Sequence, residues 1–219
     1  MAASGGLAAD FLALGDSYTI GEGVEEDARW PVQLAAALRA RGIAVAPPRI
    51  IARSGWTTDE LIAAIDQEQE QGLLKARYGL VSLQIGVNNQ YRGRDLDEFG
   101  VQFDYLLARA IAFAGGDPHR VLAASIPDWG VTPFGVASGR DRTQIAEQID
   151  QFNAEAQARS ARRGVAWVEV TDLSRDPALA HALVADGLHP SGEMYARWVE
   201  RLQAAIADPA EARGNPSAG

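Results

Sequence analysis

Residues 11–18 read Phe-Leu-Ala-Leu-Gly-Asp-Ser-Tyr, so four apolar residues run directly into a glycine and two polar residues. A short apolar run that stops at Gly is typical of a buried strand, and the polar residues after it belong in a turn. Similar runs recur along the chain and predict five strands: Phe11–Leu14, Arg49–Ala52, Leu80–Ile85, Val121–Ile126 and Val165–Val170.

Helical patterns separate these runs. Trp30, Leu34 and Leu38 recur every four residues, for example, and Thr57 with Glu60 has the form of a capping box. Alternation of strands and helices predicts parallel strands joined by helical crossovers, and strands that are apolar throughout need helices on both faces. We therefore expect an α/β fold: a three-layer α/β/α sandwich with a five-stranded parallel sheet, as one domain over residues 1–207. Residues 208–219, rich in Ala, Pro, Gly and Ser, are expected to form a flexible tail.

Composition narrows the possible partners and the class of chemistry. The net charge of −9, without a cluster of Lys or Arg, argues against nucleic acid and anionic membranes as partners. The chain has no cysteine, which excludes disulfides and thiolate chemistry. Neither a signal peptide nor an apolar run long enough for membrane insertion is present, so we expect a cytoplasmic protein. Nothing in the sequence indicates the oligomeric state.

Loops that follow parallel strands meet at the carboxyl edge of the sheet, where α/β proteins bind ligands. Ser17 follows the first strand, where an exposed nucleophile would lie, although a turn or cap serine has the same appearance. Two later loops offer donors for an oxyanion hole: the backbone N–H of Gly55 and the side chain of Asn88. Ordinary turn chemistry is the alternative for each of them.

A serine nucleophile needs a base, and the chain has three histidines. His119 precedes the fourth strand, at the wrong edge of the sheet, and His181 lies in a stretch of Ala and Leu without a polar neighbour. His189 lies in Asp186-Gly187-Leu188-His189-Pro190, where a three-residue offset can bring the carboxylate of Asp186 to Nδ1. The alternative is a turn in which Asp186 only accepts hydrogen bonds from backbone amides.

Together the blocks Gly15-Asp16-Ser17, Gly55, Gly86-x-Asn88 and Asp186-x-x-His189 resemble the four signature blocks of the SGNH/GDSL hydrolase family. This resemblance implies a flavodoxin-like sandwich, no cofactor, and hydrolysis of esters or thioesters through an acyl-enzyme. It implies that Ser17 is the nucleophile, His189 the base and Asp186 its partner. The N–H groups of Ser17 and Gly55 and the side chain of Asn88 would form the oxyanion hole. The family often has Asp where this chain has Asn89, a position that is usually structural.

The substrate is less sharply indicated. Four aromatic residues lie in or near the loops at the carboxyl edge of the sheet: Trp56, Tyr91, Trp129 and Phe134. We predict that they line a pocket for the acyl group, and the alternative is that they belong to the hydrophobic core. Residues 127–139, rich in Gly and Pro, are expected to form a lid or a pocket wall. The small chain, with no insert for carbohydrate, favours a small-molecule substrate with a short acyl chain.

Three other classes of enzyme lack their motifs. The sequence has no Gly-x-Ser-x-Gly, the motif of α/β-hydrolases, and no phosphate-binding glycine loop. It also has no His-Glu-x-x-His, the spacing of a zinc site, so we expect no metal. The main alternative is a non-catalytic ligand-binding module on the same sandwich.

Overall fold

The computed structural model describes residues 8–206, and the predicted tail at 208–219 lies outside them. Five parallel strands form one sheet in the order β2-β1-β3-β4-β5. The strands are β1 (Phe11–Gly15), β2 (Arg49–Ala52), β3 (Leu80–Gln84), β4 (Val121–Ala124) and β5 (Ala166–Val168). This confirms the predicted five-stranded parallel sheet.

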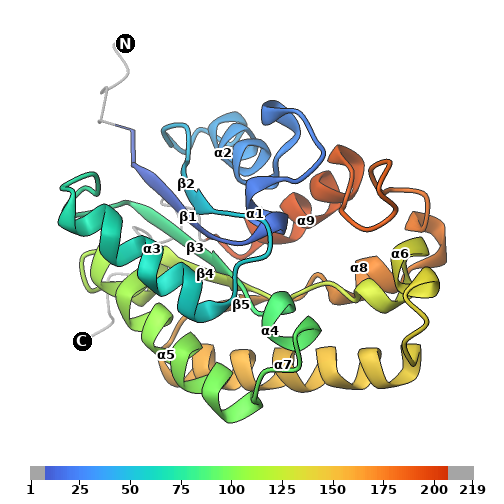
Figure 1. Cartoon of the computed structure of the whole chain (residues 1–219). Coiled ribbons are helices and arrows are strands. Elements are labelled where there is room, and N and C mark those ends of the chain that lie inside the picture. Colours follow the sequence, from blue (N-terminus) through green and yellow to red (C-terminus); the bar gives the residue numbers. More distant parts are fainter. Residues whose placement is uncertain (1–7, 207–219) are drawn as a thin grey trace, which may run out of the picture.

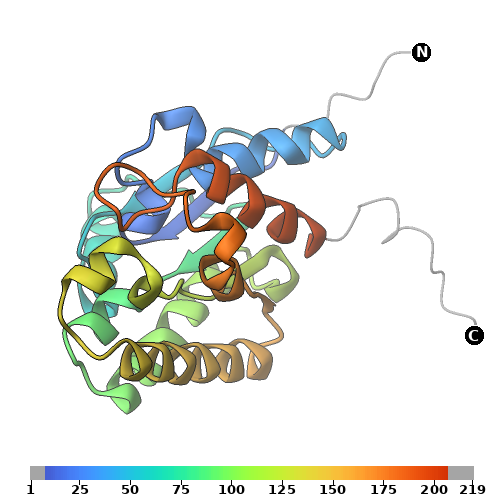
Figure 2. The same cartoon turned by 90° about the vertical axis from the view of Figure 1, so that its right-hand side faces the viewer.

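Helices cover both faces of the sheet, as Figure 1 shows, and make the molecule a three-layer sandwich. One face carries α2 (Trp30–Ala40) and α9 (Gly192–Ala204), and the other carries α3 (Thr58–Glu70), α5 (Leu96–Phe113) and α7 (Arg142–Arg162). Shorter helices stand near the strand ends: α1 (Ser17–Ile20), α4 (Val87–Tyr91), α6 (Pro133–Ala137) and α8 (Thr171–Arg175). Figure 2 views the side on which α6 and α8 lie.

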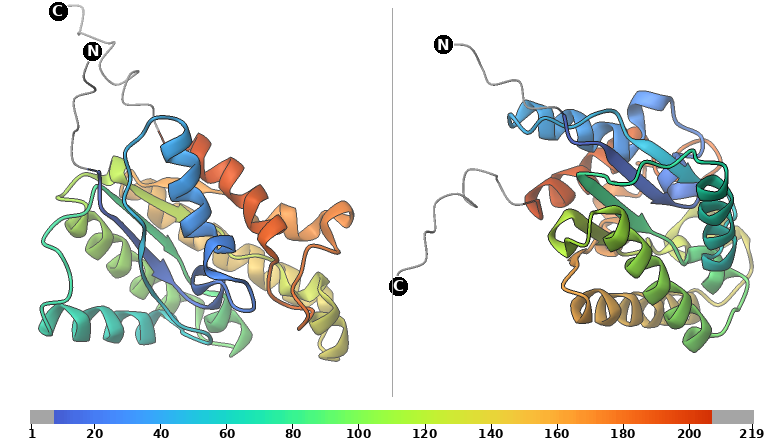
Figure 3. Two further views of the ribbon diagram at one scale, coloured as in Figure 1. Left: turned by 90° about the horizontal axis from the view of Figure 1, so that it is seen from above. Right: turned by 90° about the vertical axis from the view of Figure 1, so that its left-hand side faces the viewer.

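The long helices begin and pack as their sequence patterns predict. The N–H of Thr57 donates to the Glu60 carboxylate at 2.8 Å, one half of the predicted capping box before α3. Ser191 caps α9, whose Met194, Trp198 and Leu202 are buried. Figure 3 shows α9 lying beside α2 on their face of the sheet. No helix within residues 8–206 combines the length and the apolar character that a bilayer-spanning segment requires.

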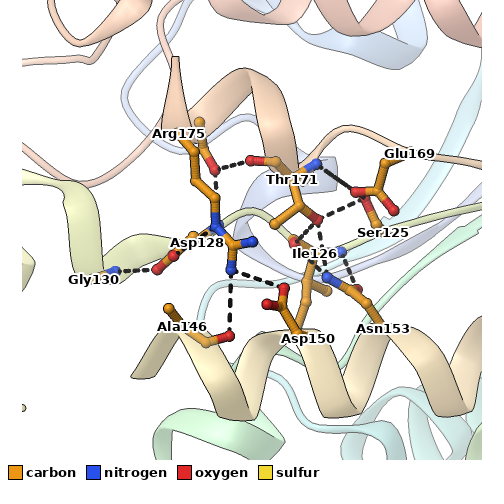
Figure 4. Close-up of polar contacts among 11 residues, drawn as sticks. Ser125, Ile126, Asp128, Gly130, Ala146, Asp150, Asn153, Glu169, Thr171 and Arg175 are labelled. Carbon is orange, nitrogen blue, oxygen red and sulfur yellow. Dashed lines mark hydrogen bonds and ion pairs between the residues drawn. The ribbon is translucent and has the colours of Figure 1, made fainter. Parts of the chain in front are cut away.

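Three strands end sooner than the apolar runs predict. β3 and β4 stop at Gln84 and Ala124, and β5 covers only residues 166–168. Beyond Ala124 the N–H of Ser125 still donates to the carbonyl of Val168 in β5 at 3.0 Å, but the backbone groups that follow bind side chains. The N–H of Ile126 donates to Asn153 Oδ1 at 2.9 Å, and Ser125 Oγ accepts the N–H of Thr171 at 3.1 Å (Figure 4). Apolar character marks burial, which continues past the last ladder hydrogen bond.

The order of the strands fixes where the functional loops meet. The chain leaves β1 toward β2 on one side and later places β3 on the other, so β1 and β3 flank a topological switch point. Gly15, the last residue of β1, pairs with Ala52 in β2 and with Gln84 in β3. The loops after these three strands therefore start at one level of the same sheet edge.

Candidate active site

Ser17 is the first residue of α1, directly after the turn that ends β1, and its side chain is almost fully buried. Gly15 makes this turn possible, because a Cβ added there would lie 2.5 Å from the carbonyl oxygen of Gln84. Asp16 caps α1: its Oδ1 accepts the N–H of Tyr18 at 3.1 Å. Burial raises the pKa of Asp16 from 3.8 to about 7.

His189 presents Nδ1 to Asp186 Oδ2 at a distance of 2.6 Å. The other carboxylate oxygen, Oδ1, accepts the N–H groups of Leu188 at 2.8 Å and of His189 at 3.0 Å. Asp186 therefore combines both roles considered from the sequence, since it closes the turn and also orients the ring. Partial burial works against its charge, but the hydrogen bonds from the His189 ring and the two amides outweigh burial and lower the pKa of Asp186.

Ser17 and His189 line the same cavity, and no hydrogen bond joins their side chains in this structure. A catalytic base and its nucleophile often reach hydrogen-bond distance only in the complex with substrate. The other two histidines lie elsewhere. His119 belongs to a 3₁₀ turn, Pro118–Arg120, ahead of β4. His181 does have a polar neighbour, contrary to the sequence-based expectation: its Nε2 lies 3.4 Å from Glu193.

Two of the three predicted donors of the oxyanion hole, Gly55 and Asn88, lie on segments that hydrogen-bond to each other. Gly55 adopts a φ of +87°, which favours glycine, and its carbonyl accepts Nη2 of Arg92 at 2.6 Å. Asn88, in α4, donates one amide hydrogen to the carbonyl of Trp56 at 2.9 Å. Because a carboxamide carries two N–H groups, the second hydrogen of Asn88 is left for a ligand.

Asn89 ties α4 to the same segment from the other side of the helix. It is buried; its Oδ1 accepts the N–H of Thr58 at 3.1 Å, and its Nδ2 donates to Thr58 Oγ1 at 2.8 Å. This arrangement agrees with the structural role expected of the position at which the sequence departs from the family pattern.

The cavity at this edge measures about 210 Å³. It is lined by the predicted site residues Ser17, Gly55, Asn88, Tyr91, Trp129, Phe134 and His189, together with Tyr18, Ser54, Val87 and Leu188. Among the predicted aromatic residues, the side chain of Trp56 does not line the cavity but packs, half-buried, against the core. Only its carbonyl serves the site. Asp186 stands behind His189, outside the cavity wall.

Three aromatic rings form one wall of this cavity. Tyr91 packs edge-on against Trp129 with ring centroids 5.1 Å apart, and Phe134 lies within 6.3 Å of both. Trp129 is fixed by a 2.7 Å hydrogen bond from Nε1 to Gln90. The segment 127–139 is thus a wall of the cavity. It also touches the histidine loop, because the N–H of Phe134 donates to the carbonyl of Gly187 at 3.0 Å.

Two of the residues at this edge that the sequence did not predict stand out. Arg92 lies four positions after Asn88, hence on the same helix face, and this spacing could have identified it. Leu188 lies directly before His189 and lines the cavity. Within residues 8–206, no group of three or more His, Cys, Asp or Glu side chains is close enough to hold a metal ion.

Comparison with known proteins gives a consistent result. Residues 13–197 match the model of the GDSL-like Lipase/Acylhydrolase family. No curated protein matches the chain.

Among solved structures, the esterase EstA from Pseudoalteromonas sp. is 16% identical, with 94% of this chain and 99% of that chain covered and a TM-score of 0.66. A variant of the acetyl xylan esterase Axe2 from Geobacillus stearothermophilus is 17% identical, with coverages of 92% and 96% and a TM-score of 0.67. A lipolytic G-D-S-L protein from Veillonella parvula is 16% identical, with coverages of 89% and 96% and a TM-score of 0.65. At these identities the similarity to solved structures shows the fold.

Proposed function

The chain belongs to the GDSL-like lipase/acylhydrolase family of carboxylic ester hydrolases, and from this premise we propose that it is a serine esterase for small esters with short acyl groups. The observation that carries the proposal is the convergence of Ser17, Gly55, Asn88 and His189 on one small cavity. The carboxylate of Asp186, whose Oδ2 lies 2.6 Å from Nδ1 of His189, completes the set of groups that acyl transfer needs.

In the proposed reaction Ser17 Oγ attacks the carbonyl carbon of the ester while its proton passes to Nε2 of His189. The carbonyl oxygen becomes an oxyanion, which accepts hydrogen bonds from the N–H groups of Ser17 and Gly55 and from Nδ2 of Asn88. The bond between the acyl carbon and the alcohol oxygen then breaks, and His189 returns the proton to the departing alcohol. Water attacks the acyl-enzyme with the same base, which releases the carboxylic acid and restores Ser17.

Asp186 does not take up the proton in this scheme. Its hydrogen bond keeps the proton of the neutral ring on Nδ1, so that Nε2 is free to accept, and its charge stabilises the imidazolium that forms. The lowered pKa keeps Asp186 ionised at neutral pH, as this role requires.

The preference for short acyl groups rests on the size and lining of the cavity. Its volume of about 210 Å³ also has to hold the reacting ester group. The wall formed by Tyr91, Trp129 and Phe134 is aromatic and suits a small alkyl group.

The test combines covalent labelling with turnover. A fluorophosphonate probe should label Ser17, as located by peptide mass spectrometry, and Ser17→Ala should abolish both the label and the hydrolysis of p-nitrophenyl acetate. Ser54→Ala, which changes the other serine of the cavity, should keep the label on Ser17. A folded wild-type chain that is neither labelled nor active would instead be a ligand-binding module on this fold.

A further inference from the structure

A second cavity, of about 260 Å³, lies beside the catalytic one. The two share three lining residues, Tyr18, Trp129 and Leu188. The further lining of the second cavity is mostly apolar and includes Pro127, Val131, Leu179, Leu183, Pro190, Met194 and Trp198. None of these seven residues takes part in the chemistry proposed above.

The second cavity lies on the histidine side of the site. Leu188 precedes His189 and separates the two cavities, and Leu183 and Pro190, joined by a β-bridge, bracket the same loop. The Tyr18 ring lies 5.6 Å from the His189 ring and 6.1 Å from the Trp198 ring. Tyr18, which lines both cavities, therefore contacts the ring of His189 on one side and a wall of the second cavity on the other.

The reaction assigns opposite sides of the site to the two halves of an ester. The carbonyl oxygen must face Gly55 and Asn88, whereas the alcohol oxygen must approach Nε2 of His189, which returns its proton. The group beyond His189 and Leu188 is therefore the alcohol. The acyl group points the other way, toward Val87 and Tyr91.

We propose that the second cavity binds the alcohol group of the substrate, and that this group is apolar and bulky, of the size of an aromatic alcohol. The proposal rests on the proposed esterase function and names its substrate class: short acyl esters of bulky apolar alcohols. Leu188 is then a specificity-determining residue, since the alcohol must pass its side chain to enter the second cavity.

The charged side chains of the second cavity support an apolar occupant, because they already have partners within the protein. Asp128, which is buried, binds Arg175 Nε at 2.9 Å and the N–H of Gly130 at 2.8 Å. Arg175 also pairs with Asp150 at 2.8 Å, and Figure 4 shows this group of contacts. Arg142 donates from Nε to the carbonyl of Gly130 at 2.9 Å. A ligand that fills the apolar part of this cavity does not have to replace these bonds.

The volume of the second cavity fits an aromatic alcohol. An apolar cavity of about 150 Å³ binds benzene. The cavity of about 260 Å³ therefore has room for one ring and several further carbon atoms. The area that such a group buries would strengthen binding through the hydrophobic effect.

The experiment compares three esters whose unactivated alcohols are similar leaving groups: ethyl acetate, naphthylmethyl acetate and ethyl octanoate. In the wild-type chain, kcat/KM for naphthylmethyl acetate should exceed that for ethyl acetate by roughly tenfold or more, since even one methylene in an apolar pocket has an effect of this order. Ethyl octanoate, which enlarges the acyl group, should gain nothing over ethyl acetate.

Leu179→Trp, on the 3₁₀ turn Pro177–Leu179, fills the second cavity at a distance from the histidine loop and should lower the ratio of the two acetate values toward one. Val131→Trp should also fill the second cavity, from another wall, and lower the same ratio. Val131 is 37% exposed, so the fold should accept the larger side chain. Leu74→Trp is the matched control: Leu74 is likewise half-buried but lies by a separate surface cavity, and the ratio should stay at the wild-type value.

A ratio near one in the wild-type chain, or a ratio that both tryptophan variants leave unchanged, would overturn the alcohol site while leaving the esterase function intact. If Leu179→Trp lowered the value for ethyl octanoate and spared naphthylmethyl acetate, the cavity would hold the acyl group, and the assignment would be wrong. Failure of the esterase function itself is recognised separately, by the absence of both Ser17 labelling and turnover of every ester.

Discussion

Arg92 lies one helical turn after Asn88, and the two side chains hold successive carbonyl groups of one segment. Asn88 donates to Trp56 at 2.9 Å and Arg92 donates to Gly55 at 2.6 Å. The segment that carries the N–H of Gly55 is thereby fixed relative to the amide of Asn88. In the proposed reaction these two donors, which come from different loops, then face one oxyanion without rearrangement, which is how preorganised donors stabilise developing charge.

Asn88→Ala should lower kcat by roughly 10²–10³ and change KM little, because the lost hydrogen bond strengthens as the oxyanion forms. The variant also frees the carbonyl of Trp56, so its unfolding temperature should be measured beside its kinetics on p-nitrophenyl acetate. A loss that appeared mainly in KM would make Asn88 a substrate-binding residue instead.

Arg92→Met should lower kcat by roughly tenfold, less than removal of a donor, because Gly55 keeps its N–H but loses the partner that holds it in place. Arg94→Met is the matched control. Arg94 also pairs with an acidic residue, Asp59, at 3.4 Å, but no hydrogen bond joins it to the Gly55 carbonyl. Equal losses of kcat in the two variants would assign the effect to general destabilisation rather than to positioning.

Asp186→Asn should lower kcat/KM by roughly 10–10³, whereas His189→Ala should cost more, because no other group at the site can carry the proton. The oxygen of the Asn side chain can still accept the N–H groups of Leu188 and His189. Its NH₂ group then faces Nδ1 of His189 and favours the tautomer with the proton on Nε2, which cannot accept the proton of Ser17. We expect less than the ~10⁴ loss known for a buried triad aspartate, since the Asp186 side chain is 42% exposed.

Both variants of the pair should be measured on one activated ester, with circular dichroism as the check on folding. Full activity of Asp186→Asn beside an inactive His189→Ala would reduce the triad to a dyad. Asp186 would then serve only to close its turn.

Asp16→Asn should flatten the dependence of stability on pH. Burial raises the pKa of Asp16 from 3.8 to about 7, so between these values the folded chain keeps a proton that the unfolded chain releases. Because the folded state binds more protons, the contribution of Asp16 to stability falls as pH rises from about 4 to about 7. Unfolding temperatures at pH 5 and pH 8 should therefore differ less in Asp16→Asn than in the wild-type chain, by an amount of the order of a few degrees.

The control for this comparison is Asp97→Asn, which changes an exposed aspartate in α5 and should follow the wild-type pH dependence. If Asp16→Asn followed it too, the carboxyl of Asp16 would not be protonated in the folded chain. The raised pKa would then have no consequence for stability.

Local patterns along the chain predicted much of the fold and the main residues of the candidate site. The apolar runs located all five strands, and the residues after them named Ser17, Gly55 and Asn88. The offset between Asp186 and His189 also proved sufficient for their contact. These features depend on neighbours in the sequence, because a strand, a turn and a cap are each decided within a few residues.

The tertiary structure decided what depends on residues far apart in the chain. The strand order places the loops of β1 and β3 side by side, and Arg92 reaches Gly55 across 37 positions. Trp56 contributes a carbonyl rather than a ring, because the packing of the core turns its side chain away from the cavity. The second cavity has the same origin. Its walls come from α1, the segment after β4, the turn before Leu183 and α9, and no local pattern records a space enclosed by segments that meet only when the chain is folded.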